Sequence, residues 1–286
     1  MVEIYRIGVV RNEEDIIEKN LQWYIDDGFP TIILDNGSTD KTYEICRSFQ
    51  GKGIVLTDQI PFQEHDRELS LKALGSLVLR ADIGWLLLAD ADEFYESPVP
   101  GESLKESLVR EIQLGYNIVQ FHNMEFWMTE KDDVTEQDFF KRIRHYSYFD
   151  SNRYKLFPNV PGLDFWGKLG HAPILPERVE YKVSTNIHIS RHYKFRSIEQ
   201  GLEKISRIRP PARRKDSSFH YVRFTPDESS FIIPSQFLTE YDDGGNWNLD
   251  RKFDGKRMSK KELMDYLGIS SEEEFRNWLN KRGLPK

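Results

Sequence analysis

The chain has 286 residues, of which 38% are hydrophobic and 30% charged, and its formal net charge is −7 at pH 7. This balance is typical of a folded protein with a core and excludes an intrinsically disordered chain. A chain of this length forms one large domain, or one domain with an appendage. The acidic net charge argues against general nucleic-acid binding, so no nucleic-acid partner is expected.

Cysteine use and hydropathy exclude two further classes. The single cysteine, Cys46, rules out an internal disulfide and a cysteine-based zinc site. No stretch approaches the roughly 20 apolar residues that a membrane helix needs, so no transmembrane segment is expected. Residues 1–6 lack the basic and apolar regions of a signal peptide. We therefore expect a soluble, cytoplasmic protein, with at most peripheral contact to a membrane.

The first hundred residues alternate between strand and helix patterns. Short apolar runs predict strands, and apolar residues at helical spacing predict the helices between them. The predicted strands are 4–10, 31–34, 53–57 and 85–89, and the predicted helices are 12–27, 41–49 and 64–81. This order predicts an α/β fold with a mostly parallel sheet flanked by helices.

The pattern is less regular after residue 100. Strands are predicted at 117–121, 153–157, 165–169 and 186–193, followed by a helix at 197–208. Two capping boxes, Ser259-x-x-Glu262 and Ser270-x-x-Glu273, then introduce two short helices. We therefore divide the chain into an α/β domain over 1–208 and a helical C-terminal extension over 209–286.

Two carboxylates, Asp90 and Asp92, end the most apolar strand of the chain. In open α/β sheets, ligands bind beyond the carboxyl ends of the strands. Acidic side chains there suit a hard divalent cation, which can clamp a diphosphate. The alternative is a strand-end turn whose acids are simply solvated.

Two other polar segments follow strands of the same predicted sheet. Arg11-Asn12-Glu13 follows the first strand, and Asp35-Asn36-Gly37-Ser38-Thr39-Asp40 follows the second. Parallel strands gather their carboxyl ends at one edge, so these segments and the acidic pair should lie together. A carboxylate after the second strand suits a nucleotide base or ribose, and a helix N-terminus favours an anionic group. Asn12 and Asp40 also fit a purely structural role as helix caps.

Together these segments resemble the nucleotide-sugar glycosyltransferases of the GT-A fold, especially the large family-2-type group of mainly inverting enzymes. The matching segments are Val9–Glu13 (VVRNE), Asp35–Asp40 (DNGSTD), Leu88–Phe94 (LADADEF) and, from one subgroup, His192–Ser197 (HYKFRS). The resemblance covers about residues 2–205. It implies a nucleotide-binding half over about 1–95 and an acceptor half over about 96–208.

The resemblance implies a role for each matching residue. Asp35 would bind the base or ribose, in a pocket that Arg11, Asn12 and Glu13 also line. Within the DXD motif, Asp92 would be the direct metal ligand, while Asp90, beside Ala91, would contact the ribose or reach the metal through water. His192 would complete the metal site, with His188 as its rival because both lie on one face of a strand. The ion would be Mn²⁺ or Mg²⁺, acting as a Lewis acid on the departing nucleoside diphosphate.

An inverting transfer also needs a base that deprotonates the acceptor hydroxyl. In the related subgroup, a block like Lys155-Leu156-Phe157…Phe165-Trp166-Gly167-Lys168-Leu169-Gly170-His171 often ends in His-Glu, but here His171 is followed by Ala172. We therefore take Asp164 as the first candidate for the base, with Glu125 and His171 behind it.

The leading hypothesis is a metal-dependent glycosyltransferase that moves a hexosyl or pentosyl group from a UDP- or GDP-sugar to a hydroxyl acceptor. Glycan, lipid-linked and protein acceptors all stay open. The alternatives are a nucleotidyltransferase and a non-catalytic sugar-nucleotide or glycan-binding protein on the same scaffold. A basic cluster that follows His192 is either a solvated surface or a lid that contacts the diphosphate; its members are Arg207, Arg209, Arg213, Arg214 and Lys215.

Overall fold

The computed structural model describes residues 2–62, 67–78, 83–166, 170–208, 228–250 and 258–282. The chain forms two compact units: unit 1 holds Met1–Asn123 and Asp150–His192, and unit 2 holds Met124–Phe149 and Tyr193–Lys286. These limits do not coincide with the boundary expected at residue 208. The basic side chains from Arg207 to Lys215 lie outside the described part of the structure.

Unit 1 begins with four parallel strands, as the alternating pattern predicts. Neighbouring strands are β3, β2, β1 and β4, in that order, and all of their pairings are parallel. Their bounds are β1 Ile4–Val10, β2 Thr31–Asp35, β3 Ile54–Gln59 and β4 Trp85–Leu88. The register places Val10 beside Asp35 and Asp35 beside Gln59, so the ends of these strands meet at one edge.

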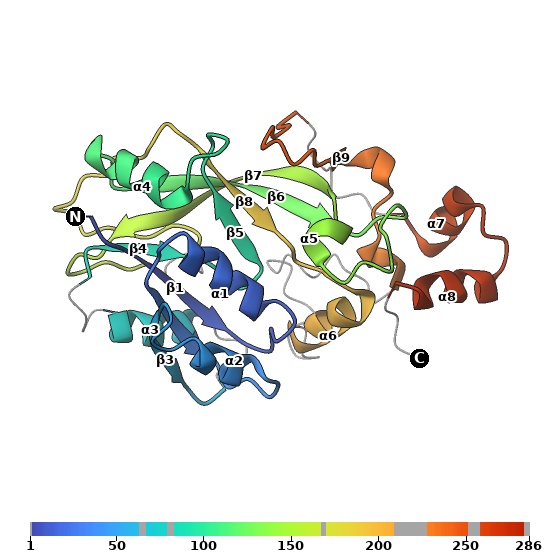
Figure 1. Ribbon diagram of the computed structural model, residues 1–286, viewed down its shortest axis with the longest axis horizontal. Helices are drawn as coiled ribbons and strands as arrows, with labels where there is room; N and C mark the ends of the chain where they lie inside the picture. The colour runs from blue at the N-terminus through green and yellow to red at the C-terminus, as the bar shows by residue number, and fades with distance from the viewer. Residues whose placement is uncertain are drawn as a thin grey trace. The chain divides into compact units, whose positions relative to one another are not determined.

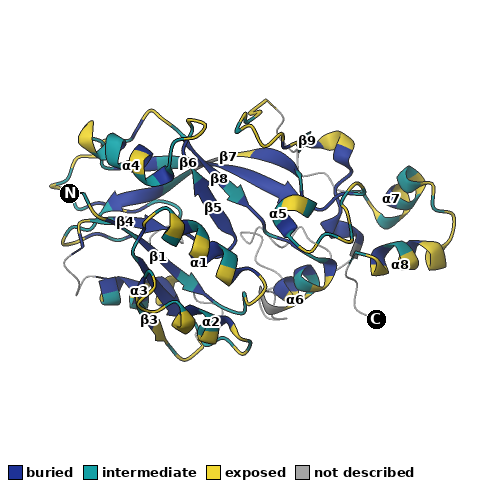
Figure 2. Cartoon of the chain, viewed as in Figure 1, coloured by how far each residue is buried: buried dark blue, intermediate teal, exposed yellow. Residues whose placement is uncertain are grey.

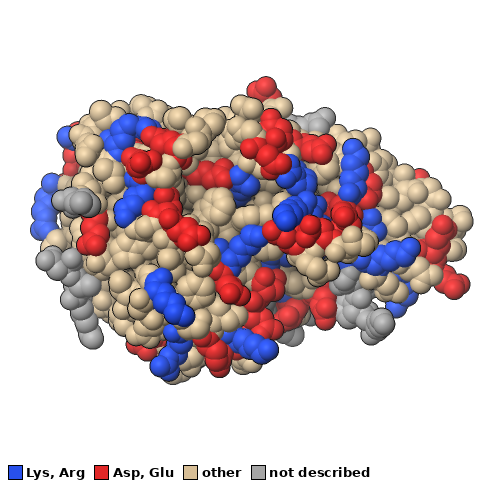
Figure 3. Space-filling view, in the orientation of Figure 1, with Lys and Arg blue, Asp and Glu red and all other residues tan. Residues whose placement is uncertain are grey.

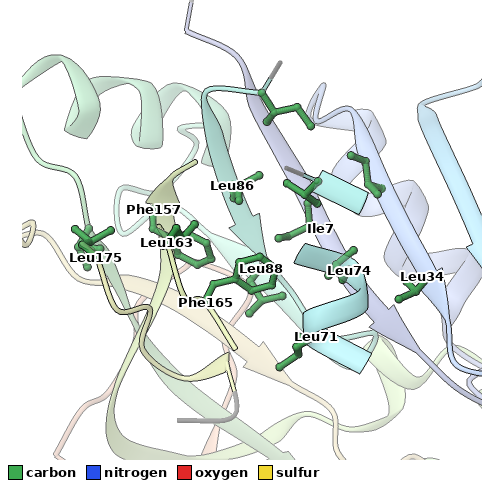
Figure 4. Close-up of a cluster of buried hydrophobic side chains, with 14 residues drawn as sticks. Ile7, Leu34, Leu71, Leu74, Leu86, Leu88, Phe157, Leu163, Phe165 and Leu175 are labelled. Carbon is green, nitrogen blue, oxygen red and sulfur yellow. The ribbon is translucent and has the colours of Figure 1, made fainter. Parts of the chain in front are cut away.

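Helices cover both faces of these strands (Figure 1). Their bounds are α1 Ile17–Asp26, α2 Thr42–Ser48, α3 Arg67–Val78 and α4 Leu104–Gln113. On one face, Leu71 and Leu74 of α3 pack against Ile7 and Leu88 in the cluster that Figure 4 shows. On the other face, Tyr24 of α1 and Leu108 of α4 belong to a second buried cluster with Leu87 and Ile4. Because successive side chains of a strand point to opposite faces, these strands contribute to two separate hydrophobic clusters, one on each face of the sheet.

The prediction of a mostly parallel central sheet is confirmed for β1 to β4, and antiparallel pairings extend the sheet beyond them. The full order is β3-β2-β1-β4-β7-β6-β8-β5, with β9 also paired to β7. Antiparallel pairing is seen between β4 and β7, between β5 and β8, and between β7 and β9. The bounds are β5 Glu93–Glu96, β6 Val119–Trp127, β7 His145–Pro158, β8 His188–His192 and β9 Thr239–Glu240.

Unit 2 is rich in aromatic side chains. The ring of Phe126 stacks on Tyr193, with a centroid distance of 4.5 Å, and Tyr241 stacks on Trp247 at 5.0 Å. Its helices are α5 Phe139–Arg142, α6 Ile198–Ile208, α7 Lys260–Leu267 and α8 Glu272–Asn280, with the short 3-10 helices η4 Glu228–Phe231 and η5 Ser235–Phe237.

Glu130 ties the two C-terminal helices to the rest of unit 2. Its carboxylate accepts hydrogen bonds from the Tyr266 hydroxyl of α7 and from the backbone and side chain of Ser235. Its carbonyl accepts from Arg282, just beyond α8. The predicted pair of short helices is thus confirmed, and both helices belong to unit 2.

Three local predictions are wrong, and one helix was missed. Asn12 does not cap a helix, because its φ is +48°, a left-handed conformation that Asn tolerates, and α1 begins at Ile17. The second C-terminal cap is Ser271, not Ser270. Helix α4 was not predicted, although Ser103 and Glu106 form a capping box there. In place of a strand at 165–169, Asp164 forms an isolated bridge to Ile174, and residues 167–169 lie outside the described part.

Burial follows this architecture. In Figure 2 the strands of the sheet are largely buried, whereas the helices expose one face each. Acidic and basic side chains are interspersed on the face shown in Figure 3. Among the described residues, no helix has the length and apolar character required to span a bilayer.

Candidate functional site

The segments that follow β1 and β2 are held together by hydrogen bonds. Both main-chain carbonyls of Asn36 and Gly37 accept from the Arg11 guanidinium, at 2.7 Å each. The same guanidinium lies over the Phe62 ring, 3.5 Å from its centroid, which is a cation–π contact. Arg11 therefore bridges the second segment and the residues that follow β3.

Asn12 and Glu13 extend this contact. The backbone N–H of Asn12 donates to Ser38 Oγ at 2.9 Å, and the side-chain oxygen of Asn12 accepts from the backbone N–H of Thr39 at 2.8 Å. The Glu13 amide donates to Thr42 Oγ1, also at 2.8 Å. The predicted meeting of these two segments is thus seen in the structure, with a dense hydrogen-bond network between them.

Asp35 is fully buried where β2 ends. Its Oδ1 accepts from the Ser38 amide and from Gln59 Nε2, both at 2.8 Å, and its Oδ2 accepts from Ser38 Oγ at 2.5 Å. These bonds give the carboxylate a structural role in shaping the turn.

Asp90 forms an ion pair with Arg67, the first residue of α3, in which one guanidinium nitrogen contacts both carboxylate oxygens. Its two oxygens lie 2.7 and 2.8 Å from Arg67 Nη2. The Asp90 side chain is 21% exposed and that of Arg67 is 38% exposed. Burial is the largest influence on Asp90 and would raise its pKa, but the positive charges of Arg67 and Lys155 help to hold that pKa below its ordinary value. The neighbouring Ala91 is buried.

Glu93, the third acid of this cluster, lies in a buried ion network. Its carboxylate contacts Arg153 Nη1 at 2.7 Å and Lys155 Nζ at 3.0 Å, and it accepts from the Tyr95 hydroxyl at 2.5 Å. Burial would raise the pKa of Glu93, yet Lys155 and Arg153 lower it well below its ordinary value. Residues 89–92 connect β4 to β5 and carry Asp90 and Asp92; we call them the acidic turn. With its partners Arg153 and Lys155, Glu93 links this turn to β7 and does not serve as an open cation ligand.

Asp92 faces His192, which comes from β8, a hundred positions later in the chain. His192 Nε2 lies 3.5 Å from Asp92 Oδ2, and the two side chains are 8% and 10% exposed. The pairing of β5 with β8 explains the approach, since His192 stands opposite Glu93 in the register. The other ring nitrogen, Nδ1, lies 3.2 Å from Asn123 Nδ2.

His188, the rival of His192, lies at the far end of the same strand pair. It is fully buried, and its Nε2 is 2.9 Å from Ser107 Oγ of α4. Burial lowers its pKa to about 4. His188 therefore belongs to the packing between α4 and β8, and it does not share the edge with Asp92.

The three candidates for the base differ in setting. Asp164, in unit 1, exchanges backbone hydrogen bonds with Ile174. Glu125, in unit 2, is buried and its carboxylate pairs with Lys194 Nζ at 2.8 Å. Burial, with Lys155 and Arg153 adding to it, lowers the pKa of His171 in unit 1 to about 3. A base of that pKa accepts a proton poorly at neutral pH.

A divalent cation fits the pair of Asp92 and His192. Bonds from Mg²⁺ to oxygen are about 2.0–2.1 Å long, so one cation can reach two donors that are 3.5 Å apart. Among the described residues, no group of three or more His, Cys, Asp and Glu side chains is arranged to hold a metal. Mg²⁺ commonly uses one or two carboxylates together with substrate phosphates and waters, so the pair suits a cation that arrives with a diphosphate.

Three cations of this site were not predicted. Arg67, Arg153 and Lys155 balance the acids Asp90 and Glu93. A signal was present in the sequence, since residues 153 and 155 place two cations on one face of a predicted strand, where they require acidic partners.

Comparison with known proteins adds distant structural likenesses only. No protein-family model and no curated protein sequence matches the chain. S. aureus TarS 1-349 aligns with 80% of this chain and 70% of its own length, at 14% identity and a TM-score of 0.38. The same protein in complex with UDP-GlcNAc aligns with 77% of this chain and 69% of its own, at 14% identity and a TM-score of 0.36. The longer TarS chain aligns over 41% of its length, at 15% identity and a TM-score of 0.36.

Proposed function

We propose that this chain is a metal-dependent inverting glycosyltransferase that uses a UDP- or GDP-sugar donor. The observation that carries the proposal is the approach of His192 Nε2 to Asp92 Oδ2, at 3.5 Å. The two residues come from the DXD segment and the late histidine segment of the family pattern. A structural turn alone gives no reason for a buried carboxylate to face an imidazole from a distant strand at the ligand-binding edge of a sheet.

Asp92 and His192 are the residues that would hold Mn²⁺ or Mg²⁺. When bound, the ion would supply positive charge that stabilises the departing nucleoside diphosphate. Arg67 lies beside Asp90 and would offer a guanidinium to the same phosphates or to the ribose that Asp90 contacts. Both charges serve the leaving group, whose negative charge grows as the sugar is transferred.

We place the base or ribose of the nucleotide beside Arg11, Asn12, Glu13 and Asp35. The Asp35 carboxylate already accepts hydrogen bonds from Ser38 and Gln59. A nucleotide contact to Asp35 would therefore exchange at least one of these bonds. Gln59 is the partner that a base can replace without unfolding the turn, because the Ser38 bonds define the turn itself.

Asp164 stays the first candidate for the base that deprotonates the acceptor hydroxyl. The low pKa of His171 weakens that residue as a proton acceptor, and the ion pair with Lys194 occupies one oxygen of Glu125. The acceptor is a hydroxyl of a glycan, a lipid-linked sugar or a protein.

A non-catalytic sugar-nucleotide binder is the second candidate. Two observations favour it: Asp90 and Glu93 are both neutralised by cations. Such a site would bind a nucleotide sugar without turning it over.

One experiment separates these functions. The full chain is incubated with Mn²⁺ and a panel of UDP- and GDP-sugars, and release of nucleoside diphosphate is measured with and without an acceptor panel. We expect turnover that EDTA abolishes and that Asp92→Asn lowers by at least about 100-fold, with an unchanged melting temperature. This loss is the size expected when a group that stabilises transition-state charge is removed.

Asp26→Asn, an exposed acid at the end of α1, is the matched control and should keep full activity. Binding of a donor without any turnover would support the binder instead. Full activity in Asp92→Asn would remove Asp92 from the site.

A further inference from the structure

Arg6, in the middle of β1, carries a charge into the core of unit 1. Its side chain is fully buried on the α1 face of the sheet, with the guanidinium 5.4 Å from the centre of the Tyr24 ring. Among the described residues, no carboxylate forms an ion pair with it. The acceptors of its hydrogen bonds are neutral: Asn20 Oδ1 at 2.7 Å and the Ala89 carbonyl at 3.2 Å.

Stability does not account for this arginine. Removing a charge from water costs several kcal/mol, and apolar replacements of buried ionic groups are often neutral or stabilising. Burial accordingly lowers the pKa of Arg6 below its ordinary value. Gly8 adds a second cost, since a Cβ there would lie 2.6 Å from the Ala89 carbonyl oxygen and 3.1 Å from Arg6 Nη1. The strand therefore has glycine, without a side chain, at the position next to the guanidinium.

The hydrogen bonds of Arg6 lead directly to the acidic turn between β4 and β5. Asn20, also fully buried, accepts from Arg6 and donates through Nδ2 to the carbonyls of Asp90, at 3.3 Å, and Glu93, at 3.0 Å. Arg6 itself donates to the carbonyl of Ala89. Both ends of the turn that carries Asp90 and Asp92 are therefore held from beneath by one connected pair of side chains.

The geometry points to Arg6 and Asn20 as positioning residues of the donor site. Arg6 holds Asn20, and the two side chains together fix the carbonyls of Ala89, Asp90 and Glu93. The turn so fixed sends the Asp90 carboxylate to Arg67 and the Asp92 carboxylate to His192. This role rests on the proposed function, because the two carboxylates matter in these directions if they serve a nucleotide and its cation.

The test compares Arg6→Met and Arg6→Lys with the unchanged full chain. Hydrogen exchange is followed at the amides of Ala89, Glu93 and Tyr95, which donate to Ile7 O, Asp90 O and Tyr24 Oη. Binding of UDP-sugars in the presence of Mn²⁺ is measured by calorimetry. We expect Arg6→Met to keep or raise the melting temperature, to speed exchange in the turn at least tenfold and to weaken donor binding about 10- to 100-fold, as for other residues that orient metal ligands. Arg6→Lys should restore part of both.

Ser107→Ala is the matched control, because Ser107 is another fully buried polar residue of unit 1, bonded to His188. It should lower the melting temperature without changing exchange in the turn. Unchanged exchange in Arg6→Met would overturn the inference, and so would faster exchange throughout unit 1 with a lower melting temperature. If the unchanged chain binds no nucleotide sugar, the proposed function fails, while the exchange data still decide whether Arg6 positions the turn.

Discussion

At the scale of single residues, the ion pairs of Asp90 and Glu93 differ in how much they contribute to the stability of the fold. Asp90 pairs with Arg67 at a partly exposed position, where an ion pair contributes about 0–1 kcal/mol to stability. Arg67→Met should therefore change the free energy of unfolding by less than about 1 kcal/mol. It leaves Asp90 without its cation, so we expect tighter binding of free Mn²⁺ and weaker binding of UDP, measured by calorimetry.

Lys72→Met is the control for Arg67→Met, since Lys72 pairs with Glu68 on the exposed side of the same helix. It should leave both affinities unchanged. Equal or parallel shifts of the Mn²⁺ and UDP affinities in Arg67→Met would contradict a charge-balancing role.

Glu93 presents the opposite case, because it is buried together with the fully buried Lys155. Removing one partner of a buried pair leaves an uncompensated charge and costs about 3–5 kcal/mol. Glu93→Gln should lower the free energy of unfolding by about that amount in urea titrations. A loss below about 1 kcal/mol would show that Lys155 finds another partner or loses its proton.

At the scale of elements, the sequence predicts best where contacts are local. Strands β1 to β4 and helices α1 to α3 were predicted because each βαβ step packs against the next one along the chain. The antiparallel pairs were not, because β5 meets β8 across about a hundred positions and no turn signal connects them. The same separation hid the ion network of Glu93, whose partners lie on β7.

The two C-terminal helices give an element-scale prediction. Leu263 of α7 and Phe275 and Leu279 of α8 are buried, and each such side chain contributes about 1.5–3 kcal/mol. Deleting residues 259–286 exposes the surface they cover and removes both bonds to Glu130. We expect calorimetry to show a lower transition temperature for unit 2, while the acidic turn of unit 1 keeps its exchange protection.

Ser271→Ala is the control for this deletion, since it removes only a helix cap and should cost about 1 kcal/mol. An unchanged unit 2 transition in the truncated chain would show that the two helices are a separate appendage.

At the scale of the whole molecule, the two polar segments that follow β1 and β2 meet at one sheet edge as expected, but their side-chain partners could not be predicted. Arg11 reaches Asn36 and Gly37, as the parallel order requires. Asp35 was expected to contact a nucleotide; the structure shows it buried and bonded to donors that were not predicted, Ser38 and Gln59. Sequence patterns place the backbone, whereas the direction of a buried carboxylate depends on which donors are nearest, and those come from several strands.

Global unfolding should depend on pH through the buried histidines. The pKa of His188 is about 4 in the folded chain, because of burial, whereas an unfolded histidine has an ordinary value near 6.5. Below pH 6.5 the unfolded chain therefore binds a proton that the folded chain does not, and stability falls as the pH drops from about 6.5 to 4. At about 1.36 kcal/mol per pH unit, His188 alone accounts for up to about 3 kcal/mol. His171, with a pKa of about 3, adds a loss of stability over the same pH range and slightly below it.

His188→Gln keeps a donor for Ser107 and removes one titration. The free energy of unfolding of this variant, measured in urea between pH 7 and 4.5, should therefore fall less steeply with decreasing pH. Identical slopes for the two proteins would show that His188 takes up its proton equally in both states.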